Sequence, residues 1–211
     1  MNNKGILTIV SGFSGAGKGT LMRELITRYD NYALSISATT RMPRMGENHG
    51  VEYFFKTVEQ FEKMIAEEEL IEYAKYVGNY YGTPRTYVEQ QMEMGKDVIL
   101  EIEIQGALKV KALFPEALLL FITPDSMGEL KERLIGRGTE TIEVINSRME
   151  RALKEAEGME QYDYLIVNDN LDDCVKHMHQ IIQGEHSRTF RNTGFVQRIR
   201  RELEDHVKGA L

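Results

Sequence analysis

The chain has 211 residues, 42% of them hydrophobic, and a formal net charge of -7 from 26 basic and 33 acidic side chains. Length and composition suffice for one main domain with a sizeable core, and the negative charge argues against a nucleic-acid partner. The single cysteine, Cys174, cannot form an internal disulfide, and no window approaches the ~20 apolar residues of a membrane span. We therefore expect a cytoplasmic protein with no export signal and no membrane partner.

Four short apolar runs predict the strands of a parallel sheet. They lie between longer amphipathic stretches and show no alternation of apolar and polar residues, as expected where helices cover both faces of a sheet. The runs are Ile6 to Val10, Val98 to Ile102, Leu118 to Ile122 and Tyr164 to Val167. The predicted fold class is α/β.

The first run leads into the glycine-rich segment GFSGAGKGT, Gly12 to Thr20, which is followed by a stretch with helical spacing up to Tyr29. Gly15 and Gly17 allow backbone conformations in which successive N–H groups point at phosphate oxygens. Lys18 adds a positive charge, and the start of the helix adds its dipole. Strand, loop and helix in this order predict a phosphate-binding P-loop. A glycine-rich turn that only joins strand to helix is the alternative.

The P-loop departs from the common pattern at one position. Gly19 stands where G-x-x-x-x-G-K-[ST] has a hydroxyl residue that contacts magnesium, and Thr20 follows one place later. GKGT is also how adenylate-kinase-like sequences read here. Thr20 is therefore a candidate magnesium contact, and the ligation of the metal stays open.

Between residues 37 and 82 the pattern changes to short strand-like pieces, Glu52 to Phe55 and Leu70 to Val77, around a helix-like stretch, Val58 to Glu69. We interpret this segment as an inserted subdomain. Within it, Arg41 and Arg44 flank Pro43, which keeps the chain extended or turned. Two guanidinium groups could bind one phosphate, since their planar donors match phosphate oxygens in pairs. Two solvated loop arginines are the alternative.

Two later segments carry further candidates. In VILEIEIQG, Glu101 and Glu103 alternate with Ile102 and should lie on one side at the carboxyl end of a strand, where α/β sites form. They could also be ordinary exposed acids. The polar segment GRGTET, 136 to 141, is suited to a mobile lid.

The motifs GFSGAGKGT, TTRMPRMGE, GNYYGTPR and GRGTET, in this order and spacing, closely resemble the guanylate kinase family over nearly the whole chain up to about Leu171. The resemblance implies a P-loop nucleoside triphosphate hydrolase-like parallel sheet with helices on both faces. It also implies a division of the single domain into a core (1–36, 83–135 and 159–211), a GMP-binding subdomain (37–82) and a lid (136–158). The implied activity is transfer of the γ-phosphoryl group from ATP to GMP with Mg²⁺.

The resemblance also implies which residues act. The GMP-binding residues would be Ser37, Arg41, Arg44, Tyr53, Glu72, Tyr81, Thr83 and Glu103. The ATP-binding residues would be Gly12, Ser14, Gly15, Ala16, Gly17, Lys18, Gly19, Thr20, Arg133 and Asn168. The catalytic residues would be Lys18, Arg41, Arg137 and Arg148, and the magnesium ligands Thr20 and Glu101. The family often has aspartate in the 101/103 pair, so the division of roles between these two glutamates stays open.

The guanine-binding role of Glu72 makes chemical sense. Guanine presents N1–H and N2–H₂ side by side to a carboxylate, whereas adenine N1 is an acceptor that would face its negative charge. The hydroxyls of Ser37 and Thr83 could donate to guanine O6. Two other functions remain open: a kinase for another nucleoside monophosphate, and a noncatalytic guanylate-kinase-like interaction module. Such modules tend to lack a working P-loop, so Lys18 and its glycines argue against the second.

The C-terminal region gives weaker signals. His177 and His179 are two residues apart, which makes them a poor metal pair on a helix, and we expect that helix to be solvated. The tail is locally basic and then acidic. We predict an amphipathic helix there that packs against the body or against a second subunit, which leaves a homodimer open.

Overall fold

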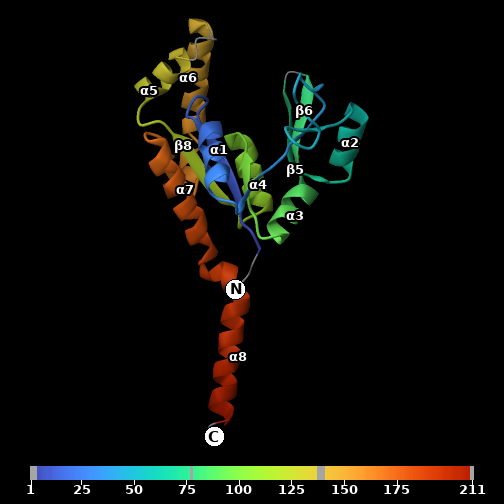
Figure 1. Cartoon of the computed structure of the whole chain (residues 1–211), viewed down its shortest axis with the longest axis vertical. Helices are drawn as coiled ribbons and strands as arrows, with labels where there is room; N and C mark the ends of the chain where they lie inside the picture. The colour runs from blue at the N-terminus through green and yellow to red at the C-terminus, as the bar shows by residue number, and fades with distance from the viewer. Residues whose placement is uncertain (1–3, 77, 137–140, 210–211) are drawn as a thin grey trace.

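The structure, a computed structural model, describes residues 4–76, 78–136 and 141–209 (Figure 1). Its central sheet has five strands in the order β2-β7-β1-β8-β9, and every neighbouring pair is parallel. The strands are β1 (Leu7–Gly12), β2 (Tyr32–Leu34), β7 (Asp97–Glu101), β8 (Leu118–Thr123) and β9 (Tyr164–Val167). All four predicted strands are confirmed. Strand β2 was not predicted, because three residues are too few to show a pattern.

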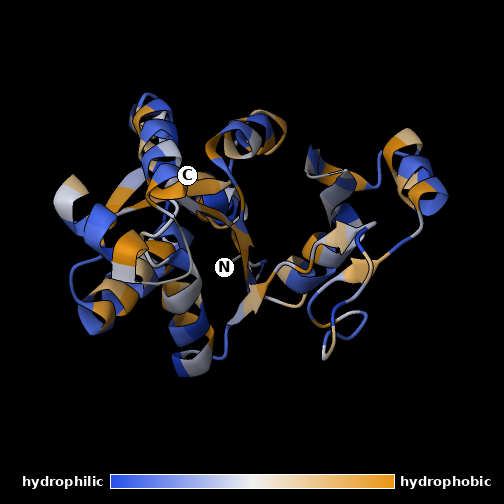
Figure 2. Ribbon diagram, turned by 90° about the horizontal axis from the view of Figure 1, so that it is seen from above, coloured by the Kyte–Doolittle hydropathy of each residue, from blue (hydrophilic) through white to orange (hydrophobic). Residues whose placement is uncertain are grey.

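Helices cover both faces of this sheet, as the unbroken apolar runs predicted. One face packs against α1 (Lys18–Arg28), α5 (Met127–Gly136), α6 (Ile142–Ala156) and α7 (Leu171–His186). The other face packs against α3 (Arg85–Glu93) and α4 (Ile104–Leu113). The interior strand β8 is buried at all of its positions, and Figure 2 shows orange, hydrophobic stretches along strands between the helices. This burial fixes the carboxyl ends of the strands, from which the candidate site is built.

A second sheet of four strands lies apart from the first, in the order β4-β3-β6-β5. Its strands are β3 (Ala38–Thr39), β4 (Phe54–Phe55), β5 (Leu70–Tyr76) and β6 (Asn79–Pro84), accompanied by α2 (Val58–Ala66). We call residues 38–84 the small subdomain. Its own buried cluster consists of Ala38, Phe61 and Leu70. The predicted helix over 58–69 starts where expected but ends at Ala66, and Glu68 already has a positive φ of 54°.

Helix α7 differs from the solvated helix expected around its histidines. His177 is exposed, but the ring of His179 stacks on Tyr29 with centroids 3.7 Å apart and interplanar angle 3°. His179 Nδ1 also lies 2.8 Å from the hydroxyl of Tyr32. The expectation was wrong for His179, because its partners lie almost 150 residues earlier and leave no trace in the local pattern.

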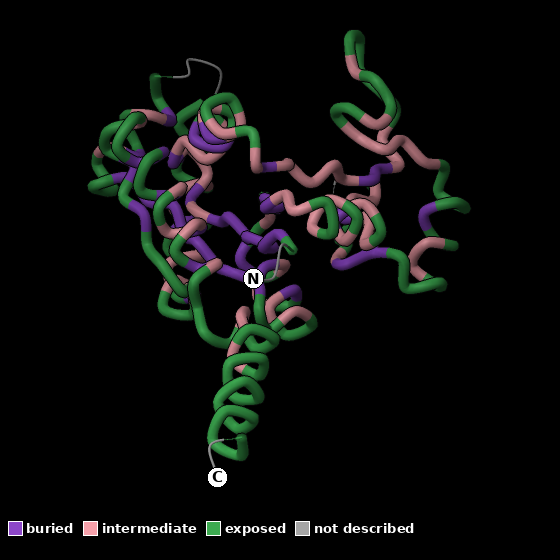
Figure 3. Tube along the Cα trace, turned by 60° about the horizontal axis from the view of Figure 1, so that its bottom comes forward, coloured by how far each residue is buried: buried purple, intermediate pink, exposed green. Residues whose placement is uncertain are grey.

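The last helix, α8 (Thr193–Gly209), follows the short 3-10 turn η2 (Thr189–Asn192) and projects away from the rest of the molecule (Figure 1). None of its described residues is buried, and its trace is almost entirely exposed (Figure 3). Of the two partners expected for this helix, packing against the body is therefore wrong, and packing against a second subunit stays a prediction. No helix among the described residues combines the length and the apolar character needed to cross a membrane.

Candidate active site

The loop Gly12 to Thr20 leaves the carboxyl end of β1, which lies between β7 and β8 in the sheet. Helix α1 starts at Lys18, and three loop glycines have positive φ, 152° at Gly12, 101° at Gly15 and 90° at Gly17. A Cβ at Gly12 would lie 2.1 Å from the carbonyl oxygen of Ile122. A Cβ at Gly17 would lie 2.5 Å from Asn168 Nδ2. These glycines are required by close approach, so the loop is a built cradle and not a loose connection.

Two positively charged side chains donate hydrogen bonds to this loop: Lys18 at the end of the loop and Arg148 from α6. Lys18 Nζ donates to the carbonyl of Gly12 at 2.6 Å and to that of Phe13 at 3.1 Å. Arg148 Nη1 donates to Ser14 Oγ at 2.5 Å. Two predicted ATP-side cations, 130 residues apart in the chain, therefore meet at one loop, as an anionic ligand would require.

A third contact ties the loop to the carboxyl end of β9. Asn168 is buried, and its amide donates to the carbonyl of Ala16 at 2.7 Å. Arg133 on α5 donates to the same carbonyl at 3.3 Å and to the carbonyl of Asn168 at 2.6 Å. The structure thus brings Ala16, Arg133 and Asn168 together, and in this state the two side chains brace the loop.

Across from the loop, the small subdomain gathers the predicted phosphate-binding residues. The Arg41 guanidinium lies 5.2 Å from the ring centroid of Tyr53, and the Tyr53 and Tyr81 rings meet edge to face at 6.1 Å. Arg41 Nη2 donates to both carboxylate oxygens of Glu47, at 2.9 and 3.0 Å. Glu47 also accepts from the backbone N–H of Arg44 at 2.7 Å, while the Arg44 side chain is exposed.

Glu47 was not predicted as a site residue. Its carboxylate occupies the Arg41 fork as a phosphate would, and the hydrogen bond from Arg41 lowers the pKa of Glu47. The sequence signal was present, since Glu47 follows Arg44 by three residues within TTRMPRMGE, but only the fold shows that the turn closes on Arg41.

The predicted guanine-binding residues lie deeper in the same subdomain. Thr83 Oγ1 donates to Glu72 Oε1 at 2.7 Å, from neighbouring strands β6 and β5. Burial raises the pKa of Glu72, and the hydrogen bond from Thr83 opposes that shift. Thr83 was expected to donate to guanine O6, and in this structure its proton goes to Glu72. Ser37 is half-buried just before β3, where its carbonyl accepts from the N–H of Phe54 at 2.9 Å.

The two glutamates of VILEIEIQG lie at the carboxyl end of β7 as predicted, but they occupy different elements. Glu101 is the last residue of the strand, and Glu103 is the N-cap of α4. The surroundings of Glu101 raise the pKa of its carboxyl through desolvation, opposed by the charges of Lys18 and Arg23. Glu103 forms an ion pair with Arg151 of α6, a residue that sequence reasoning did not single out.

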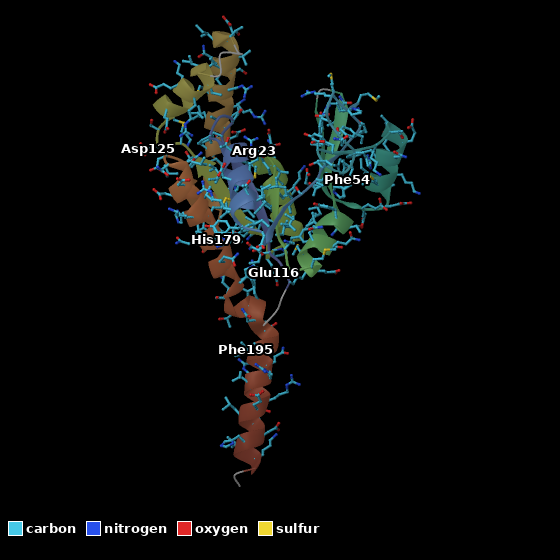
Figure 4. The ribbon with its side chains drawn as sticks, in the orientation of Figure 1. Arg23, Phe54, Glu116, Asp125, His179 and Phe195 are labelled. Atoms are coloured by element: carbon cyan, nitrogen blue, oxygen red, sulfur yellow. The ribbon has the colours of Figure 1, made fainter. Side chains whose placement is uncertain are left out.

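A cleft of about 770 Å³ lies between the phosphate loop, the sheet edge, α6 and Tyr53. Its lining includes Gly12, Ser14 and Lys18 from the loop, Glu101 and Glu103 from the sheet edge, Arg148 and Arg151 from α6, and Tyr53 from the small subdomain. The lining residues come from two separate parts of the molecule: the core, in which Figure 4 labels Arg23, and the small subdomain, in which it labels Phe54. The predicted catalytic residue Arg137 lies outside the described residues.

Comparison with known proteins fits this geometry. A model of the family described as guanylate kinase matches residues 4–185. The chain belongs to the guanylate kinase family. It is 53% identical to a guanylate kinase of Halalkalibacterium halodurans over 188 residues, covering 89% of this chain and 92% of that protein. It is 51% identical to a guanylate kinase of Bacillus subtilis over 187 residues, covering 88% and 92%. The crystal structure of guanylate kinase from Anaplasma phagocytophilum superposes with a TM-score of 0.68 at 31% identity and covers 88% of each chain.

Proposed function

We propose that this protein transfers the γ-phosphoryl group of ATP to GMP, giving ADP and GDP, as a cytoplasmic enzyme of the guanylate kinase family. One observation carries the proposal. A single cleft is lined on one side by Lys18 and Ser14 of a phosphate loop and on the other by Tyr53, which packs with Arg41. Two phosphate sites facing one cleft are what transfer between two nucleotides requires.

The donor side would hold the triphosphate on the N–H groups of the loop. Lys18 would offset charge on the phosphates together with Arg148 and Arg137, while Arg133 and Asn168 shape the loop near the adenosine end. Arg148 already donates to Ser14, so its guanidinium lines the cleft without a change of rotamer. Arginine suits this role because its charge persists at every physiological pH.

The acceptor side would hold GMP through Arg41, Arg44, Tyr53 and Tyr81 at the phosphate and through Glu72, Ser37 and Thr83 at the base. Since Arg41 is paired with Glu47, the GMP phosphate would replace that carboxylate. The Glu72 carboxylate would accept from guanine N1–H and N2–H₂, and Thr83 holds it in place for that purpose. Glu103 would bind GMP near the base once its ion pair with Arg151 is broken.

The residues present fit a magnesium ion bound together with phosphates. Among the described residues, no group of three histidine, cysteine or acidic side chains could hold a metal by itself. Thr20 and Glu101 offer two oxygen ligands near the loop, and Mg²⁺ is commonly held by one or two protein ligands plus phosphate oxygens and water. Bound there, the ion would offset phosphate charge.

The chemical step needs little covalent help from the protein. A phosphate oxygen of GMP forms a bond to the γ-phosphorus as the bond from that phosphorus to the β-γ bridging oxygen breaks, and the electron pair leaves with ADP. The contribution of this chain is to align the two nucleotides, to offset charge with Lys18 and arginines, and to exclude water.

The test is a comparison of GMP, AMP, dTMP and UMP as acceptors, with ADP production followed by a coupled assay. We expect turnover with GMP and at least about 100-fold lower kcat/KM for the others, since a wrong base leaves buried polar groups unpaired. A preference for any other acceptor would identify a different monophosphate kinase. Failure to bind ATP would identify the noncatalytic module instead.

A further inference from the structure

One face of α6 lines the candidate active-site cleft. The residues that do so follow the three- and four-residue spacing of a single helix face. They are Val144, Ser147, Arg148, Arg151 and Glu155. The two arginines are three residues apart, so their side chains start about 5 to 6 Å from each other on the same side of the helix. One helix therefore presents two cations to the cleft, and the proposed function uses only Arg148.

Arg151 contacts a different wall of the cleft. Whereas Arg148 donates to Ser14 of the phosphate loop, Arg151 forms an ion pair with Glu103, the N-cap of α4. The Nε of Arg151 also donates to Glu155 Oε1 at 2.9 Å, one turn further along α6. The side chain of Glu155 is only 16% exposed, so it holds Arg151 on the cleft side of the helix even when Glu103 is engaged elsewhere.

Glu103 lies between this arginine and the proposed guanine site. A Cβ on Gly106, in the first turn of α4, would lie 3.9 Å from Glu72 Oε2. Figure 1 shows α4 between α6 and the small subdomain that carries Glu72. Guanine N2 has two hydrogens, and the arrangement proposed for Glu72 uses one of them. The other hydrogen is available to Glu103 when its carboxylate turns away from Arg151.

We propose that Arg151 is a catalytic residue, which GMP releases from Glu103 so that it binds the donor phosphates. The ion pair is broken at little cost, because the side chains of Glu103 and Arg151 are 68% and 48% exposed and exposed pairs contribute little. The triphosphate beside Arg148 then offers phosphate oxygens, which a guanidinium binds in pairs. Arg151 joins Lys18 and Arg148 in offsetting the charge of the transferring group. This inference rests on the proposed function.

A purely structural role of Arg151 predicts a different change in the kinetic constants. If Arg151 only held Glu103 in place for the base, its loss would raise the KM for GMP and leave kcat almost unchanged. If GMP displaces Arg151, its loss removes both a competitor for Glu103 and a cation that acts in the transfer step. The KM for GMP and kcat then fall together.

Steady-state kinetics of the full chain with ATP and GMP separate these two roles. We expect Arg151→Gln to lower kcat by about 10-fold or more. It should also lower the KM for GMP by about two- to fivefold, which is the weight of one exposed ion pair. Arg151→Lys keeps the charge and should recover most of kcat. Lys154→Gln is the matched control, because it removes one positive charge from an exposed position of α6 outside the cleft lining, and both constants should stay unchanged.

Calorimetry tests the link between the two nucleotides without turnover. The probe is the ATP analogue with an imido group between the β- and γ-phosphorus atoms, titrated with and without GMP. GMP should tighten its binding to the wild type, and this gain should shrink by about threefold or more in Arg151→Gln. In Glu103→Gln the arginine is released without GMP, so the analogue alone should bind more tightly than it does to the wild type.

The outcomes distinguish this inference from the proposed function. An unchanged kcat in Arg151→Gln, with the KM for GMP unchanged or raised, would overturn the role of Arg151 and leave the proposed function standing. So would an undiminished gain from GMP in the calorimetry of that variant. Absence of turnover of GMP by the wild type would overturn both.

Discussion

Lys18 reaches back over the phosphate loop and donates to the carbonyls of Gly12 and Phe13. Lys18 therefore holds the loop while its charge faces the cleft. Removing its side chain should impair the ATP side of the site and spare the GMP side. Lys18→Ala should lower kcat by about 100- to 1000-fold, the usual loss when one preorganised donor is removed. The dissociation constant for GMP, measured by calorimetry, should stay within about threefold, because the acceptor groups belong to the small subdomain.

The exposed Lys131 on α5 offers a control for the change in total charge, and Lys131→Ala should leave both values unchanged. An equal collapse of GMP affinity in Lys18→Ala would show that the donor and acceptor sites are not separate.

The burial of Glu72 predicts that the KM for GMP depends on pH. Its pKa is raised by desolvation, so the carboxyl becomes protonated at a higher pH than an ordinary glutamate. Only the ionised form accepts from both guanine donors. The KM for GMP should therefore rise as the pH falls toward the raised pKa, starting above the usual carboxyl range near ~4.3.

Glu72→Gln separates this effect from the titration of the GMP phosphate. The variant should raise KM by roughly 100-fold at neutral pH, because two charge-assisted hydrogen bonds are weakened. The ratio of its KM to that of the wild type should shrink in acid, where the wild type loses the same charge. Glu69→Gln, an exposed acid of the same subdomain, is the control. A ratio that stays constant with pH would remove Glu72 from guanine recognition.

His179 of α7 contacts Tyr29, just after α1, and Tyr32 of β2. This contact should make the stability of the folded protein depend on pH. Gln183 donates to the Tyr32 hydroxyl, which can then donate to His179 Nδ1. Burial lowers the pKa of His179 and keeps the ring neutral, as that hydrogen bond requires. A depressed folded-state pKa contributes stability above the unfolded value near ~6.5 and loses it as the pH falls through the folded value.

His179→Phe keeps a ring on Tyr29 but cannot accept the hydrogen bond. At pH 7.5 it should lower the free energy of unfolding by about 1 kcal/mol, measured in urea. The difference from wild type should narrow between pH 7 and pH 5. His177→Phe, exposed two residues earlier on the same helix, should show neither effect. A difference that is independent of pH would mean that His179 does not titrate with folding.

Strands were predictable from sequence where a short apolar run stands out, even at β9, in which only Ile166 is buried. The strands β1, β7, β8 and β9 were found because each is an apolar run, and the phosphate loop because its glycines and lysine have few other uses. What depends on distant partners was not predictable. The contact of His179 with Tyr29, the pairing of Glu47 with Arg41 and that of Arg151 with Glu103 arise only when the fold brings separate segments together.

For the molecule as a whole, the main question is how its two nucleotide sides meet. The small subdomain has its own buried cluster around Phe61, while Ile71 of its strand β5 belongs to the cluster that packs against α3 and α4. It is connected to the core on either side of residues 38–84, which suits movement as one body. Transfer requires the acceptor oxygen to come within about 3.5 Å of the γ-phosphorus with water excluded. We therefore expect the small subdomain to close on the core when both nucleotides bind.

Spin labels on Glu59 of α2 and Lys176 of α7 report this motion by pulsed electron spin resonance, since both positions are exposed. An adenosine and a guanosine joined by five phosphates should shorten the distance by more than about 2 Å. ATP alone should shorten it less, because it leaves the acceptor groups unfilled. The control pair, Lys176 with Gln90 of α3, should not change, because α3 packs on the central sheet. If the distance between Glu59 and Lys176 did not change, phosphoryl transfer would have to take place with the cleft open.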